Sequence, residues 1–348
     1  MPNSSHPSGK APTIYDVAHR AGVSSQTVVR FLNGFEGMTK KTQEKVRRAI
    51  ADLDYRPNSI ARALRTTSPR RILLFVHGLQ HAGPANIVAA THSAAAAAGY
   101  GLEIVPLDVA NVEAGRRLIL ETDPSLVAGA LALAPTPEME RIFDALPKRI
   151  PLLREVNGDG LEGPRSQGPK DPGTRLVVEH LHHLGHRRLF LVEGPAGWSS
   201  SERRARSAIA TAAELNMQVT GRRRGDWSAA SGFAAIRDVQ SLGGATAVVC
   251  ANDDSALGAM LALSQLGLRI PEDVSVVGYD DISTAAYMNP PLTTVRVDFE
   301  MSGRIAVDRL IALMAERTGQ EVQRTTEGPT PPQLIVRSSS GLAPNPSA

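Results

Sequence analysis

TIYDVAHRAGVSSQTVVRFL, residues 13–32, is the stretch that decides the fold of the first part of the chain. Its apolar residues recur at helical spacing on both sides of Gly22. Thr13 is followed three residues later by Asp16, which matches a capping box, and Ser24 starts a second helical run directly after the glycine. The pattern predicts a helix, a tight turn and another helix.

A third helix follows this stretch, and the N-terminal part of the chain carries a net positive charge. Thr39 is a predicted N-cap, and the residues after it place apolar side chains on one face and Lys and Arg on the other. Residues 1–70 hold twelve Lys and Arg against five Asp and Glu, a balance of +7, although the whole chain carries only +3. Basic charge on a small helical domain favours a polyanion as its partner over a merely solvated surface.

The second helix, residues 23–30, is the one that a helix-turn-helix inserts into the major groove of DNA. We expect base contacts from its outward polar residues, Ser25, Gln26 and Arg30, because Gln pairs with adenine and Arg with guanine. Candidate phosphate contacts are Thr13, Tyr15, Thr27, Asn33 and the basic third helix. The alternative is that these are ordinary solvated side chains of a small helical domain.

From residue 70 onward, short apolar runs alternate with longer helical ones, which predicts α/β architecture with parallel, doubly wound sheets. The predicted strands are 72–76, 102–107, 128–133, 151–156, 189–192, 247–251 and 274–278. The predicted helices are 84–98, 112–121, 137–146, 173–184, 201–215, 229–241, 254–266 and 300–317. Gly and Pro crowd residues 157–172, which indicates a crossing between two lobes. A ligand would bind between the lobes, at the carboxyl ends of the strands.

The composition argues against a secreted protein and against a membrane-spanning protein. Cys250, the single cysteine, lies in the apolar run 247–251, which favours a buried, inert thiol over a nucleophile. Residues 1–11 lack the apolar core of a secretory signal, and no later apolar run is long enough to span a bilayer. We expect a cytoplasmic protein with no membrane partner.

Several motifs, in a constant order along the chain, resemble the lac repressor family, and within it the branch of the lac repressor. They are residues 13–18, 21–24, 27–28, 31–34 and 55–58 near the N-terminus, and 225–228, 251–253, 276–281 and 290–294 further on. The resemblance covers residues 12–337. It implies a homodimeric repressor of carbohydrate-metabolism genes, whose core is of periplasmic-binding-protein type. Such a protein binds a pseudo-palindromic operator under the control of a small sugar, and it is not an enzyme.

The resemblance also implies roles for individual residues. Residues 58–65 keep helical spacing but are too short for a stable helix, and they would fold only on the operator as a hinge. There Asn58, Ala61 and Leu64 would enter the minor groove, with Leu64 as the apolar wedge. Implied sugar-binding residues are Arg204, Trp227, Asn252, Asp280 and Phe299. His77, His81 and Glu155 are further candidates for the same ligand.

The implied domain limits are 12–56 for the DNA-binding head, 57–68 for the hinge and 70–337 for the core. Within the core, we expect the N-terminal lobe at about 70–170 and 299–327, and the C-terminal lobe at about 171–297 and 328–337. Residues 1–11 and 338–348 are expected to be disordered. No leucine heptad follows Arg337, so we expect a dimer without further assembly.

Two positions depart from the family pattern. Val29 replaces the usual Ser of the recognition helix, so the operator is expected to differ. In the first loop after a strand, His77, Gln80 and His81 replace smaller or apolar groups of the lac repressor. The ligand is therefore expected to be a different sugar, larger or more polar.

Three rival interpretations carry less weight. Asp253-Asp254 and Asp280-Asp281 could be the carboxylate pairs of a glycosidase, but adjacent residues do not point at one atom, and Asp254 could equally be a helix cap. The histidines of residues 179–186 could bind zinc, although packing and surface roles are favoured. A periplasmic-type sugar-binding protein without a DNA role is the strongest alternative. We expect no catalytic residue, metal or cofactor.

Overall fold

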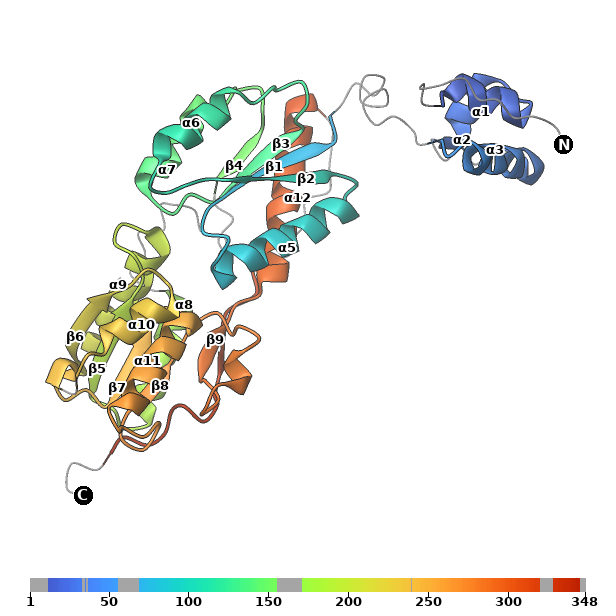
Figure 1. Ribbon diagram of the computed structural model, residues 1–348. Helices are drawn as coiled ribbons and strands as arrows, with labels where there is room; N and C mark the ends of the chain where they lie inside the picture. The colour runs from blue at the N-terminus through green and yellow to red at the C-terminus, as the bar shows by residue number, and fades with distance from the viewer. Residues whose placement is uncertain are drawn as a thin grey trace. The chain divides into compact units, whose positions relative to one another are not determined.

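The computed structural model describes residues 12–32, 35, 37–55, 69–154, 171–238, 240–319 and 328–344. The chain divides into two compact units, Met1–Pro69 and Arg70–Ala348 (Figure 1). Each unit has its own apolar core, so each is described by itself.

The first unit is all-α, as predicted. Its helices are α1 (Ile14–Ala21), α2 (Ser25–Leu32) and α3 (Lys40–Asp52). Each helix contributes one fully buried valine to a shared core, Val17 from α1, Val28 from α2 and Val46 from α3. Because the valines meet, the turn between α1 and α2 is fixed by packing as well as by local sequence.

Local signals set the limits of these helices. The predicted capping box is present: the Thr13 hydroxyl accepts from the Asp16 amide at 3.4 Å, and the Thr13 amide donates to the Asp16 carboxylate at 2.7 Å. Gly22 ends α1 with φ +65°, a left-handed conformation that suits glycine. The Thr39 hydroxyl accepts from the Thr42 amide, which confirms the predicted N-cap of α3.

The N-terminal lobe of the second unit contains a parallel sheet with the order β2-β1-β3-β4 among the described residues. Its strands are β1 (Arg71–Val76), β2 (Gly101–Pro106), β3 (Gly129–Ala132) and β4 (Leu152–Arg154). Its helices are α5 (Ala82–Ala97), α6 (Val112–Leu120), α7 (Pro137–Ile142) and α12 (Phe299–Thr318). Alternate residues of β1 face opposite layers: Leu73 and Phe75 pack with α6 and α7, whereas Ile72 and Leu74 pack with α5 and α12.

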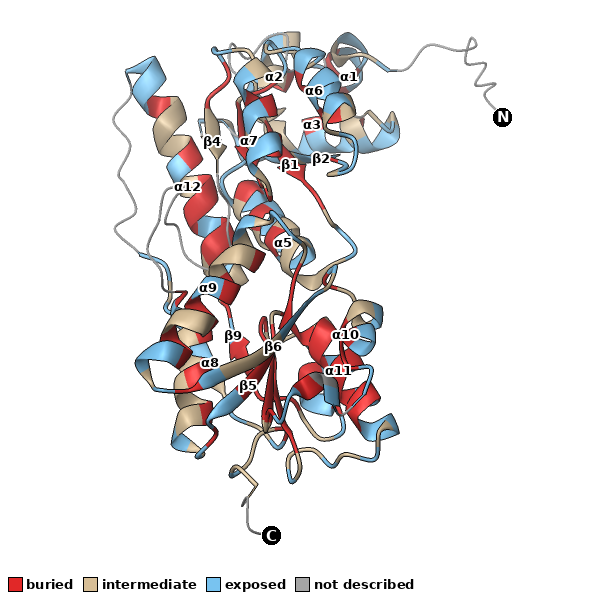
Figure 2. Cartoon of the chain, turned by 90° about the vertical axis from the view of Figure 1, so that its left-hand side faces the viewer, coloured by how far each residue is buried: buried red, intermediate tan, exposed pale blue. Residues whose placement is uncertain are grey.

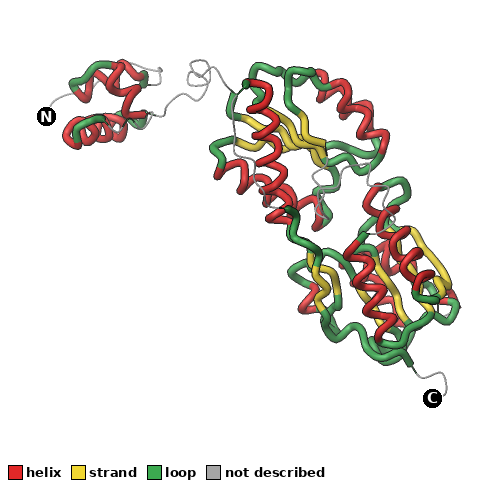
Figure 3. The backbone as a smooth tube through the Cα atoms, turned by 180° about the vertical axis from the view of Figure 1, so that it is seen from behind, coloured by secondary structure: helices red, strands yellow, loops and turns green. Residues whose placement is uncertain are grey.

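The C-terminal lobe repeats this plan, with the described sheet order β6-β5-β7-β8. Its strands are β5 (Arg188–Glu193), β6 (Gln218–Arg224), β7 (Ala247–Cys250) and β8 (Ser275–Val277). Its helices are α8 (Pro172–His183), α9 (Ser199–Glu214), α10 (Ala229–Ala235) and α11 (Asp253–Gln265). Helices cover both faces of the sheet in each lobe (Figure 3), and the inner strands β1, β3, β5 and β7 are largely buried (Figure 2). The predicted pair of doubly wound lobes is therefore correct.

The chain crosses between the lobes next to the first residue of α12. β9 (Thr294–Arg296) pairs antiparallel with β10 (Gln333–Ile335), so the segments before and after α12 lie together. Phe299 packs against the apolar cores of both lobes. The crossing at Phe299 is thus a packed joint that touches both halves of the core.

Some parts of the core differ from the sequence-based expectation. β6, β9 and β10 were not predicted, and the helix expected at 229–241 ends at Ala235. Residues 338–344, expected to be disordered, lie against β8: the Val276 amide donates to the Ser339 carbonyl at 2.8 Å, and Ser339 is fully buried. The tail is ordered because it satisfies backbone groups at the edge of the sheet.

Residues 1–11 and 345–348, also expected to be disordered, lie outside the described residues. Across the described parts of the chain, no helix combines the length and apolar character needed to cross a bilayer.

Candidate functional site

A cleft lies between the two lobes of the core and encloses about 780 Å³, open solvent at its mouth included. Its lining includes every predicted sugar-binding residue that the structure describes: His77, His81, Arg204, Trp227, Asn252, Asp280 and Phe299. The cleft is where the two-lobe architecture predicts a ligand.

Arg204 of α9 is the central cation of the cleft. Its guanidinium donates to the Ala251 carbonyl at 2.5 Å and to the Asp280 carboxylate at 3.3 Å. It also lies over the ring of Tyr279, 3.6 Å from the ring centroid. These contacts hold a planar, multiply donating group at the carboxyl edge of the sheet, which suits recognition of neighbouring hydroxyls.

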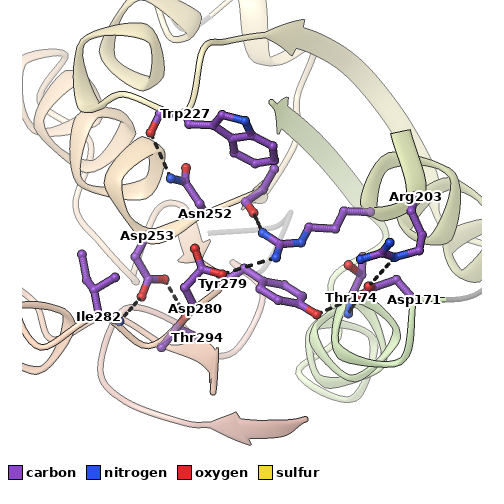
Figure 4. A network of polar contacts seen from close by, with 12 residues as sticks. Asp171, Thr174, Arg203, Trp227, Asn252, Asp253, Tyr279, Asp280, Ile282 and Thr294 are labelled. Carbon is purple, nitrogen blue, oxygen red and sulfur yellow. Dashed lines mark hydrogen bonds and ion pairs between the residues drawn. The ribbon is translucent and has the colours of Figure 1, made fainter. Parts of the chain in front are cut away.

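Trp227 and Asn252 are joined by a hydrogen bond. The Asn252 side-chain amide donates to the Trp227 carbonyl at 2.9 Å (Figure 4). Asn252 is also the N-cap of α11, because its side-chain oxygen accepts from the Ser255 amide at 3.1 Å. The sequence-based suggestion that Asp254 caps this helix is therefore wrong.

Two residues that line the cleft have strained backbone conformations. Trp227 has φ +73° and Asp280 has φ +106°, a region that non-glycine residues rarely adopt. Gly194, at the end of β5, makes room for the indole: a Cβ there would lie 2.5 Å from the Trp227 ring. Strained conformations of this kind persist where surrounding contacts over-determine them, and they cluster at ligand sites.

A buried carboxylate lies behind the cleft. Asp253 is fully buried, and it accepts hydrogen bonds from the Thr294 hydroxyl at 2.5 Å and the Ile282 amide at 2.9 Å (Figure 4). Burial, with a further contribution from the neighbouring Asp280 charge, raises the pKa of Asp253 to about 8. Asp253 therefore holds the loop after β8 in place and is not placed to act on a ligand.

The N-terminal lobe supplies two histidines. Burial, with a smaller contribution from the nearby His81, lowers the pKa of His77 to about 4. Burial also lowers the pKa of His81, against a smaller opposing effect of Asp254 and Asp226. His77 is thus a neutral imidazole at physiological pH, with one N–H donor and one nitrogen acceptor.

Trp198 is a cleft residue that the sequence analysis missed. It is half-buried, and its ring centroid lies 6.1 Å from that of Trp227 and 4.8 Å from that of His77, whose ring is nearly perpendicular to it. A signal was available, because Trp198 lies between the predicted strand 189–192 and the helix after it. That is the loop position where parallel sheets bind ligands.

In the first unit, the predicted recognition helix presents exposed polar side chains. Gln26 and Arg30 are exposed, Ser25 is half-buried, and the Arg30 guanidinium lies 5.3 Å from the centroid of the Phe35 ring. Phe35 was not singled out from the sequence. Its contact with Arg30 orients the candidate guanine-reading side chain.

The residues predicted to contact phosphates differ in exposure and in whether their polar groups already make hydrogen bonds within the chain. Tyr15 is 72% exposed. The Thr13 hydroxyl donates to Asp16 in the capping box, and the Thr27 hydroxyl is 2.9 Å from that of Ser24. Asn33, Asn58, Ala61, Leu64 and Glu155 lie outside the described residues.

Two of the histidines of residues 179–186, the alternative zinc site, make hydrogen bonds with other groups of the protein. The His180 ring is 2.9 Å from the Ser340 hydroxyl, and the His186 ring contacts the Thr246 hydroxyl at 2.8 Å and the Gly341 carbonyl at 3.1 Å. Within the described ranges, no group of three or more His, Cys, Asp or Glu is arranged to hold a metal ion.

The geometry agrees with what comparison with known proteins shows. Residues 13–58 match the family described as bacterial regulatory proteins, lacI family, and residues 178–340 match a periplasmic binding protein-like domain. The lactose operon repressor of Escherichia coli (strain K12) is 36% identical over 338 residues, which cover 97% of this chain and 92% of that protein. The chain belongs to the lacI family.

Solved structures of family members extend the match to three dimensions. The lac repressor dimer bound to operator and the anti-inducer ONPF superposes with a TM-score of 0.81 at 34% identity, covering 95% of this chain and 100% of that one. A complex of the transcriptional regulator CelR with cellobiose gives a TM-score of 0.63 at 27% identity, covering 94% of this chain and 100% of that one. As a lacI-family member, the chain is a transcriptional regulator with a DNA-binding head and an effector-binding core.

Proposed function

We propose that this lacI-family regulator is a repressor of carbohydrate-metabolism genes. It binds a pseudo-palindromic operator as a homodimer, and its affinity for the operator changes when a small sugar occupies the cleft. The observation that carries the proposal is the set of groups at one cleft wall: Arg204, Asn252 and Asp280 beside the ring of Trp227. Paired polar groups bind adjacent hydroxyls, while an aromatic face packs on a pyranose ring.

The head supports recognition of specific DNA sequences. Gln26 and Arg30 extend from one exposed side of α2, where they can reach base edges in a major groove. Ser25 is a third candidate for a base contact. Thr13, Tyr15, Thr27, Asn33 and the Lys and Arg of α3 would hold phosphates, which position the head without reading sequence.

The hinge couples the head to the core in this proposal. Residues 58–65, with Asn58, Ala61 and Leu64 entering the minor groove, would fold only on operator DNA. A bound sugar shifts the balance between two arrangements of the lobes, and one of these allows the two hinges of a dimer to fold. The size of the effect is limited by the difference in sugar affinity between the two arrangements.

Apolar side chains on the C-terminal lobe support the homodimer. Leu257 and Leu261 lie four residues apart on α11 and are 43% and 54% exposed, and Phe233 of α10 is also exposed. An apolar cluster on a surface indicates a protein interface. The lac repressor relative was solved as a dimer on its operator.

The test uses the full-length protein and a palindromic duplex enriched by it from a random DNA pool. Both tryptophans of the chain line the cleft, so intrinsic fluorescence reports sugar binding there, while anisotropy of the labelled duplex reports operator binding. At least one hexose or disaccharide should alter both signals, with a change in operator affinity of about tenfold, a typical coupling. A sugar that alters the fluorescence at saturation and leaves operator affinity unchanged would contradict control by the cleft.

A further inference from the structure

An exposed phenylalanine follows the predicted recognition helix. Phe35 is 51% exposed, whereas Phe31 of α2 packs against the apolar core of the head. That core is formed by residues of the three helices and by Val23, Leu53 and Tyr55, without Phe35. A single exposed apolar side chain is ordinary on a protein surface, so the contacts of Phe35 decide what it does.

Two contacts join Phe35 to the last turn of α2. The Phe35 amide donates to the Arg30 carbonyl at 3.0 Å, and the Arg30 guanidinium lies over the Phe35 ring, 5.3 Å from its centroid. The first contact fixes where the backbone of Phe35 leaves the helix. The second holds the side chain of Arg30, so one residue contacts both the backbone and the guanidinium of the candidate guanine-reading residue.

Gly37 leaves room for the ring of Phe35. A Cβ at this position would lie 2.5 Å from Cε1 and 2.9 Å from Cζ of that ring. The ring therefore lies against the backbone of Gly37 as well as against Arg30. Any side chain at position 37 would displace the ring from its place.

The contact with the ring leaves the hydrogen-bonding groups of Arg30 available. A cation–π attraction is electrostatic and takes up no hydrogen-bond donor. Within the described part of the head, no hydrogen bond or ion pair engages the Arg30 guanidinium. A long side chain that is already held in one orientation loses less conformational freedom when it binds a base. The ring of Phe35 can thus strengthen the contact of Arg30 with guanine O6 and N7.

We propose that Phe35 is a positioning residue for base reading: its ring holds the guanidinium of Arg30 in the orientation that reads a guanine, and Gly37 allows the ring to reach this place. The inference rests on the proposed function, because it names a residue that sets the specificity of the same DNA-binding head. Phe35 acts through Arg30, so its effect is confined to the base pair that Arg30 reads.

The experiment uses the full-length protein and the palindromic duplex that it enriches from random DNA, together with duplexes changed symmetrically at one base pair each. Arg30→Ala identifies the base pair that Arg30 reads, because it removes the preference there. Phe35→Ala should reduce the preference at that base pair by about fivefold, as loss of a cation–π contact does. It should change the preference at other base pairs, and the affinity for random DNA, by less than about twofold.

Further variants separate an aromatic contact from simple packing. Phe35→Tyr keeps the aromatic face and should retain the preference, whereas Phe35→Leu keeps an apolar side chain and should lose it. Gly37→Ala displaces the ring without removing it, so it should reduce the preference as Phe35→Ala does. Combined with Phe35→Ala, Gly37→Ala should have no further effect.

A double-mutant comparison tests whether Phe35 acts through Arg30. In the Arg30→Ala protein, Phe35→Ala should leave the remaining base preferences unchanged. If Phe35→Ala weakens all duplexes by one factor, or if Phe35→Leu reads DNA as the wild type does, the inference is wrong and sequence-specific binding by the head stands. If the protein enriches no duplex at all, the proposed function fails and the inference fails with it.

Discussion

His77 is the residue whose burial has the clearest thermodynamic consequence. Its pKa is about 4 in the folded chain against 6.5 for an unperturbed histidine, because burial disfavours the charged ring. Between these values the unfolded chain binds more protons than the folded one, so stability falls as pH decreases through this window. Above pH 6.5 the contribution of His77 to stability is fully present.

Comparison of the wild type with His77→Phe isolates this effect. Between pH 7.5 and pH 5 the wild type should lose about 2 kcal/mol of unfolding free energy more than the variant, the amount that the shifted pKa predicts. Asp253, whose raised pKa acts in the opposite direction, is present in both proteins and cancels. Urea unfolding at the two pH values measures the difference. An equal loss in both proteins would mean that His77 is not held neutral.

Arg30 is the residue most directly assigned to base reading. Arg30→Ala should cost about 1–3 kcal/mol on the preferred duplex and remove the preference at one base pair, as loss of one bidentate contact does. The matched control is Lys45→Ala on the exposed face of α3, which should weaken all duplexes alike. Selection of binding sites from random DNA with both variants tests this prediction. If Arg30→Ala selects the same DNA motif as the wild type, Arg30 does not read a base.

Resemblance to a known family predicted much of the lining of the cleft. Trp227, Asn252 and Asp280 lie in motifs of that family, Arg204 was implied by the same resemblance, and the structure brings the four together. Trp198 was missed because no motif contains it. Its role depends on a neighbour from the other lobe, His77, more than a hundred positions away along the chain.

At the scale of elements, the contact between α10 and α11 is made by glycine. A Cβ on Gly258 would collide with the Ala229 carbonyl, and one on Gly232 with the Ser255 backbone. The two helices therefore touch backbone to backbone. This contact fixes the start of α10, two residues after Trp227, and so helps to place the indole in the cleft.

Gly258→Ala should disturb both the lobe and the site. Overpacking at a backbone contact should cost about 1–3 kcal/mol of unfolding free energy, and it should weaken saccharide binding through the shifted Trp227. Gly83→Ala in α5 is the stability control, because a Cβ there meets no atom within 4 Å. Thermal unfolding of both variants, with Trp fluorescence, gives the comparison. Equal stability of the two would show that α10 and α11 can separate at no cost.

The apolar pattern of the sequence predicts some helices and strands well and others not at all. Helices and buried strands were predicted closely, since β1, β5 and β7 are continuous apolar runs between turn signals. β6 was missed because it is an edge strand that ends in three arginines and has no continuous apolar face. The ordered tail was missed because it is held by backbone hydrogen bonds from Ser339, which composition does not reveal.

At the scale of the whole molecule, the proposal requires two copies of the chain. Leu261→Asp should place a charge in the apolar cluster of α10 and α11, convert the dimer to a monomer and weaken operator binding by about a hundredfold, as loss of two-headed binding does. Leu342→Asp changes an even more exposed leucine outside this cluster and should leave the dimer intact. Light scattering and operator titration measure the two effects, and a dimeric Leu261→Asp would place the interface elsewhere.

In the proposed function, one chain recognises DNA with its first unit and a sugar with its second. The most direct measurement is the ratio of dissociation constants for the selected palindromic duplex and for random DNA at physiological ionic strength. We expect the palindrome to bind at least about a thousandfold more tightly, the lower end for specific regulators. Equal affinity for the two duplexes would contradict the account and leave a sugar-binding protein without a DNA role.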